Sequence, residues 1–212
     1  NNTVMPPIIS APATSEGQQD PPDQFDGCID VNVAAPQWSK GGGGRAYIET
    51  LVRETIAAAY VIAAPSALKA REVEISISLE NNDVVHQLNK EHRGKDKPTN
   101  VLSFPSLSFS GRLTDEMCEG ELGPDGMPVL LGDIILAYGV VSNEAKAQGK
   151  TFDHHLMHLL VHGLLHLLGH DHQEDKGAQE MEGLETDILL ALGVDDPYSD
   201  VEHIGAENGV KL

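Results

Sequence analysis

Residues 162–172 read His-Gly-Leu-Leu-His-Leu-Leu-Gly-His-Asp-His, and we expect the rest of the chain to be organised around this stretch. His162 and His166 stand four positions apart in an apolar run, which predicts a helix that carries both imidazoles on one face. We expect Gly169 to end this helix, because glycine readily adopts the left-handed conformation found at helix ends. The chain can then turn back and bring His172 to the same point.

Three imidazoles in the spacing His-x3-His-x5-His predict a zinc site on this late helix. Catalytic zinc commonly has three protein ligands and one position for water, whereas a structural site is closed by four protein ligands. Seven of the ten histidines fall between residues 154 and 172, so chance explains the cluster poorly. We therefore expect one Zn²⁺ per chain, held by His162, His166 and His172. The cluster also contains histidines without an assigned role, which are His154, His155, His158 and His170.

The residue after the first histidine separates this pattern from zinc peptidases. Those enzymes carry Glu at that position as the general base, whereas this chain has Gly163. The sequence therefore disfavours proteolysis and favours chemistry in which a metal activates water or polarises a phosphoryl oxygen. No residue stands out as a general base, and the candidates by chemistry alone are Asp133, Asp171 and Glu174.

Composition and charge narrow the function further. The chain has 212 residues and 40% apolar content, which suits one domain with a real core. Its net charge of −19 would argue against nucleic acid binding. Between Lys90 and Lys97, however, four basic residues stand with only two acidic ones. Because a ligand responds most to charges within a Debye length, we give this local basic segment more weight than the net charge.

Two absences in the sequence indicate the compartment. Cys28 and Cys118 do not form a C-x-x-C pair, which suits a reducing environment. The chain contains no run of 18 apolar residues, so we expect no membrane span and no membrane partner. Together these features predict a cytoplasmic protein.

Hydrophobic periodicity predicts the elements of the fold. Residues 72–79 alternate strictly, so Val73, Ile75, Ile77 and Leu79 should face the core of a strand. Further strands are expected at 28–33, 101–104 and 130–137, and helices at 46–62, 82–90, 143–149, 151–168 and 175–192, with a long mobile loop at 106–128. This order predicts an α+β fold with a small mixed sheet of about four strands packed against helices.

The predicted domain is flanked by two tails. Residues 1–27 are rich in Pro, Ser, Gln and Asp and lack Lys and Arg, which is typical of a disordered leader. We expect a single folded domain over 28–197 and a flexible tail over 198–212.

At this point several motifs resemble one family. The stretch 162–172 is similar to the signature of the YbeY endoribonucleases, the rRNA maturation factors. The other motifs that carry this resemblance are Arg93-Gly-Lys-Asp-Lys-Pro-Thr-Asn-Val-Leu-Ser-Phe-Pro105, Leu131-Gly-Asp-Ile134, Met181-Glu-Gly-Leu-Glu-Thr-Asp-Ile-Leu-Leu-Ala-Leu-Gly193 and Asp196-Pro-Tyr198. The likeness extends over about 28–198, and several specific motifs in the right order make a chance match unconvincing.

The resemblance implies a metal-dependent endoribonuclease specific for single-stranded RNA. It implies action in 16S rRNA 3′-end maturation and ribosome quality control, in the bacterial cytoplasm. By motif matching, the zinc ligands fall on His162, His166 and His172, and the family's critical arginine falls on Arg93. The resemblance also implies contacts with the 16S rRNA precursor, a small-subunit ribosomal protein and the GTPase Era. His170 stands where the family usually has Tyr.

Two further roles and two alternatives complete the interpretation. Arg93 is expected to hold an RNA phosphate, and Lys95 and Lys97 to extend the positive surface along the strand. One alternative is a ribosome-assembly factor whose zinc is structural and which does not cleave RNA. The other is a zinc peptidase-like hydrolase, which Gly163 disfavours.

Overall fold

The computed structural model describes residues 24–40, 43–108, 111–118, 122–171, 175–195 and 197–198. Most of the predicted leader and tail, 1–23 and 199–212, lies outside these residues. The third predicted zinc ligand, His172, and one candidate base, Glu174, also lie outside them.

A mixed sheet forms the centre of the described chain, as predicted. Its four strands are β1 (Gly27–Val33), β2 (Val73–Glu80), β3 (Val101–Pro105) and β4 (Val129–Ala137), in the order β1-β2-β4-β3. The pairs β1–β2 and β2–β4 are parallel, and β3 runs antiparallel to β4 at one edge. The predicted inward residues of β2 are all buried, which are Val73, Ile75, Ile77 and Leu79.

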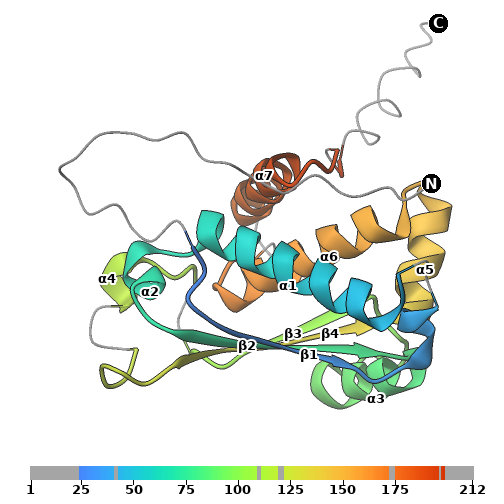
Figure 1. Ribbon diagram of the computed structural model, residues 1–212, viewed down its shortest axis with the longest axis horizontal. Helices are drawn as coiled ribbons and strands as arrows, with labels where there is room; N and C mark the ends of the chain where they lie inside the picture. Colours follow the sequence, from blue (N-terminus) through green and yellow to red (C-terminus); the bar gives the residue numbers. More distant parts are fainter. Residues whose placement is uncertain are drawn as a thin grey trace, which may run out of the picture.

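Helices cover the two faces of the sheet unequally (Figure 1). The longer helices are α1 (Gly44–Ala63), α3 (Asn82–Arg93), α5 (Tyr138–Ala147), α6 (Phe152–Leu167) and α7 (Asp175–Ala191). Helices α1 and α6 lie on one face with α7 packed on them, while α3 lies on the other face. The short helices are η1 (Pro36–Ser39), α2 (Ser66–Lys69) and α4 (Asp115–Cys118).

Alternation along β4 and β3 confirms that α3 and α6 pack on opposite faces. Ile134 and Leu136 point into the main core with the apolar side of α6. Leu102 and Ala137 point the other way and form a smaller core with Val85 of α3. The sheet therefore separates the segment that ends in Arg93 from the helix that carries the histidines.

Some boundaries differ from the predicted ones. Helix α3 continues to Arg93 and ends at Gly94, whose φ is 67°, so Arg93 is the last helical residue rather than part of a loop. Helix α5 begins at Tyr138, directly after β4, because Val141 and Ala145 pack inward one turn apart. The predicted loop 106–128 contains α4.

Order also extends past both predicted domain ends. The ring of Phe25, assigned to the leader, packs edge-on against Tyr60 with centroids 5.2 Å apart. Tyr198, assigned to the tail, donates a hydrogen bond to Glu185. Among the described helices, none combines the length and the apolar character that a membrane crossing requires.

Candidate metal centre

Helix α6 presents its histidines as a stripe along one side. Thr151 caps the start of the helix, and its Oγ1 accepts a hydrogen bond from the His154 backbone N–H. It ends before Gly169, whose φ of 81° permits the turn that the sequence predicted. The stripe repeats every three or four residues and consists of His155, His158, His162 and His166, while the opposite leucines fill the core. The local sequence thus places several imidazoles along one side of α6.

Two of the predicted zinc ligands meet in the structure. The Nε2 atoms of His162 and His166 lie 3.1 Å apart. Two nitrogens bound tetrahedrally to one Zn²⁺ at about 2.0–2.1 Å would lie roughly 3.3–3.4 Å apart, so the observed separation fits a shared ion. The pair lies one helical turn apart, as their spacing predicted. The part of the chain that the structure describes holds no group of three such donors.

The other ring nitrogen of each histidine in this pair faces a hydrogen-bond acceptor. His162 Nδ1 lies 2.7 Å from Oε1 of Glu185, and His166 Nδ1 lies 3.0 Å from the backbone oxygen of His170. Both partners are acceptors, so each Nδ1 donates, and in the neutral tautomer that binds a metal each Nε2 is the ligand atom. The donor set therefore fits a metal ion with imidazole ligands.

Glu185 of α7 is the buried centre of this network. Its carboxylate is 1% exposed and accepts hydrogen bonds from His162, from His158 Nε2 at 3.1 Å and from the Tyr198 hydroxyl. Burial alone would raise the pKa of Glu185, but the hydrogen bonds from His158, His162 and Tyr198 lower that pKa to about 2. Glu185 was not among the site residues predicted from the sequence. The feature of the sequence that could have indicated it is a charged residue among the apolar residues along one side of α7.

A second polar network ties α6 to the loop before β3. His155 is buried, and its Nε2 lies 2.9 Å from Oε2 of Glu144. The same oxygen accepts a hydrogen bond from Asn100 Nδ2 at 3.0 Å. Burial lowers the pKa of His155, and the hydrogen bond that its ring donates to Glu144 opposes that shift. His155 therefore fastens helix α6 to α5 and the loop.

His170 takes part through its backbone rather than its ring. Its carbonyl oxygen accepts from His166 Nδ1, and its side chain is 8% exposed. Burial lowers the pKa of the His170 imidazole, and the nearby positive charge of Arg112 lowers it further. The residue thus orients His166 from the turn after α6.

Gly163 faces the sheet and leaves no room for a side chain. A Cβ atom at this position would lie 2.9 Å from Ile134 Cγ2 and 3.2 Å from Ser103 Oγ. A peptidase-type Glu would have to displace the core at this point. The packing therefore gives a physical reason for the glycine.

The predicted RNA-binding residues and the histidines of α6 lie on opposite sides of the edge strand β3. Arg93 ends α3, and Lys95 and Lys97 follow it, all three exposed. The His92 ring packs edge-on against Phe104 of β3 with centroids 5.1 Å apart, while the preceding residue, Ser103, faces α6. The basic side chains make no hydrogen bond or ion pair with the described histidines. A single strand, β3, thus lies between the basic segment and the histidines.

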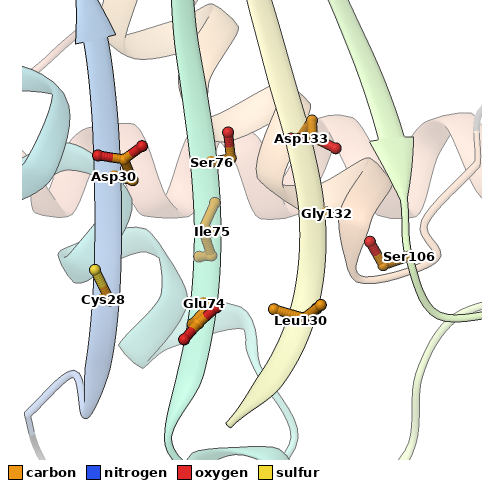
Figure 2. A pocket seen from close by; sticks show the side chains of 9 residues that line it. All are labelled: Cys28, Asp30, Glu74, Ile75, Ser76, Ser106, Leu130, Gly132 and Asp133. Atoms are coloured by element: carbon orange, nitrogen blue, oxygen red, sulfur yellow. The ribbon is translucent and has the colours of Figure 1, made fainter.

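The candidate base Asp133 lies away from the histidines. It pairs with Phe104 in the ladder and points to the face opposite α6. There it borders a shallow hollow of about 280 Å³ on the open face of the sheet (Figure 2). The residues that line this hollow are Cys28, Asp30, Glu74, Ile75, Ser76, Ser106, Leu130, Gly132 and Asp133. Asp133 therefore does not lie beside the histidine pair, whereas Asp171, another candidate base, directly follows His170 in the turn after α6.

Comparison with known proteins gives the family. Residues 45–193 match the family described as Endoribonuclease YbeY. A protein of that name from Rhizorhabdus wittichii is 46% identical over 177 residues, which cover 82% of this chain and 99% of that protein. One from Paramagnetospirillum magneticum is 53% identical over 128 residues, or 60% of this chain and 73% of that protein.

A third relative is covered over a smaller share of its length. The Endoribonuclease YbeY of Rhodopseudomonas palustris strain CGA009 is 48% identical over 131 residues, or 62% of this chain and 63% of that protein. A solution structure of a Thermotoga maritima protein covers 87% of this chain and 100% of its own, at 21% identity and a TM-score of 0.45. The match over residues 45–193 and the curated relatives show that this chain belongs to the YbeY endoribonuclease family.

Proposed function

We propose that this chain is a zinc-dependent endoribonuclease that cleaves single-stranded RNA during 16S rRNA 3′-end maturation and ribosome quality control in the cytoplasm. The observation that carries the proposal is the facing Nε2 pair of His162 and His166 in a chain of this family. Zinc held by these two residues and His172 would supply a Lewis acid that activates water and withdraws charge from a phosphoryl oxygen.

The chain's own residues prepare this site before substrate arrives. Glu185 and the carbonyl oxygen of His170 orient the two imidazoles, so both Nε2 atoms point to the same position. Fixed orientation matters because a misplaced ligand weakens metal binding and catalysis together.

Arg93, Lys95 and Lys97 hold the RNA backbone in this proposal. A guanidinium offers paired donors and a permanent charge, which suit a phosphate oxygen. These residues and the histidines flank β3 on opposite faces, so the RNA strand would cross the exposed edge of that strand. Phosphate contacts of this kind position the RNA without reading its sequence.

The proposed partners are the 16S rRNA precursor, a small-subunit ribosomal protein and the GTPase Era. These partners rest on family membership.

Cleavage of a single-stranded RNA that carries the 16S 3′ end tests the proposal. Four samples are compared: protein as purified, chelated protein, chelated protein with zinc restored, and His166→Ala with its metal content determined. We expect cleavage to be lost on chelation, to recover with zinc and to be absent in the variant. Undiminished cleavage by folded, metal-free protein would contradict a zinc enzyme, and RNA binding without cleavage in every sample would favour an assembly factor.

A further inference from the structure

Glu185 stands out among the acidic residues because its side chain is fully buried. Of the acidic residues whose exposure is described, it alone falls in the buried class. A buried carboxylate costs free energy unless donors surround it. The buried carboxylate of Glu185 at the interface between α6 and α7 therefore indicates a specific structural role.

The two carboxylate oxygens of Glu185 serve different partners. Oε1 accepts from His162 Nδ1 at 2.7 Å. Oε2 accepts from His158 and from the Tyr198 hydroxyl. We propose that Glu185 is a positioning residue that holds His162 with its Nε2 turned towards His166, as a shared zinc ion requires, and that His158 and Tyr198 in turn hold Glu185. The proposal rests on the zinc site of the proposed function but not on RNA cleavage.

His158 is assigned to this supporting role by its own ring atoms. Its Nδ1 is buried and has no hydrogen-bond partner among the described residues. A neutral imidazole carries one N–H, so that hydrogen lies on Nε2 and is donated to Glu185 Oε2. His158 is thus unsuited to share the ion of His162 although it lies on the same stripe.

The segment that carries Tyr198 is held in place by a hydrogen bond of its own. The Lys150 ammonium donates to the backbone oxygen of Pro197 at 2.9 Å, next to the tyrosine. The Tyr198 ring packs edge-on against His158 with centroids 5.7 Å apart. The end of the described chain therefore supports the metal centre through Glu185.

Glu185→Gln isolates the role of the carboxylate with little change in size. The amide oxygen could still accept from His162, but the amide nitrogen would then face the donors of His158 and Tyr198. Loss of such a supporting group typically lowers metal affinity roughly 10–100-fold, and we expect this range. Zinc affinity is measured by competition with a chromophoric chelator, and circular dichroism checks the fold. Glu182→Gln, an exposed neighbour on the same helix, is the matched control and should leave affinity unchanged.

A second measurement needs no variant. Nitrogen-15 NMR of the metal-free wild-type protein reports which ring nitrogen of His162 is protonated. We expect the hydrogen on Nδ1. A hydrogen on Nε2, or unchanged zinc affinity in folded Glu185→Gln, would overturn the proposal. Zinc binding that depends on Glu185 in a protein that cleaves no RNA would support this inference while the proposed function fails.

Discussion

Gly163 of α6 lies so close to Ile134 of β4 that a Cβ atom would come within 2.9 Å of the isoleucine Cγ2. The helix that carries the histidines is thereby held against the sheet at the residue next to a predicted ligand. Close contact at this point limits sliding or rotation of α6, which would move His162. The absence of a side chain here therefore contributes to the geometry of the candidate metal centre.

Substitution of Gly163 should destabilise the fold. Alanine favours helices by about 1 kcal/mol over glycine, but forcing a methyl group into a packed core costs about 1–3 kcal/mol. We expect Gly163→Ala to lower the free energy of unfolding by about 1 kcal/mol in urea titrations. Gly183→Ala is the control, because nothing lies within 4 Å of its added Cβ in α7. It should raise stability, and a rise for both variants would contradict the packing argument.

The features that depend on neighbours in sequence were predictable. Alternation fixed the inward face of β2, and the four-residue spacing brought His162 and His166 together. Contacts between distant segments left little local signal. Glu185 stands 23 residues after His162, and the helical start at Tyr138 depends on packing against other elements. The zinc ligand role of His172 stays a prediction.

The two cysteines should differ strongly in reactivity. Cys28 is exposed, whereas Cys118 is buried. Burial raises the pKa of the Cys118 thiol, and the charge of Asp115 raises it further, so less thiolate is present at a given pH. In the native protein, a colorimetric disulfide reagent should label one thiol fast, and Cys28→Ser should remove that phase. Rapid labelling of Cys118 before denaturation would show that this assignment is wrong.

Arg71 should control the order of the segment before β4. Its guanidinium donates to the backbone oxygens of Pro124 at 2.7 Å and Met127 at 3.0 Å, with longer contacts to Leu122 and Gly123. Lysine places a single ammonium nitrogen where the guanidinium has a rigid fork of two, so Arg71→Lys should weaken these contacts and lower stability by about 1–2 kcal/mol. Limited proteolysis should cut faster within 122–128. Arg53→Lys on the exposed side of α1 should cut like the wild type.

The Tyr47 hydroxyl should stabilise the protein only below strongly alkaline pH. It donates to Asp153 Oδ2 at 2.6 Å and joins α1 to α6. This hydrogen bond, with burial and the negative charge of Asp153, raises the pKa of Tyr47 from 10.0 to about 12. The folded state therefore binds the phenolic proton more tightly than the unfolded state. The stabilisation that this hydrogen bond gives the folded state is fully present below pH 10 and is lost as the pH rises towards 12. The free energy of unfolding should fall more over this interval in wild type than in Tyr47→Phe, and equal slopes would contradict the assignment.

Arg93 should affect turnover without affecting zinc. It ends α3 on the face of the sheet opposite α6, so its removal leaves the contacts of His162 and His166 intact. Loss of a donor that acts on a transition-state phosphate typically costs about 10²–10³ in kcat, and we expect Arg93→Ala to fall in the lower part of this range. Zinc content by atomic absorption and unfolding in urea should match the wild type. Arg45→Ala, which removes an exposed ion pair with Glu49 on α1, is the control for lost surface charge. If Arg93→Ala turned over RNA as fast as this control, Arg93 would have no role in the mechanism. The residues around the turn at Gly169 would then be the next candidates for the phosphate contact.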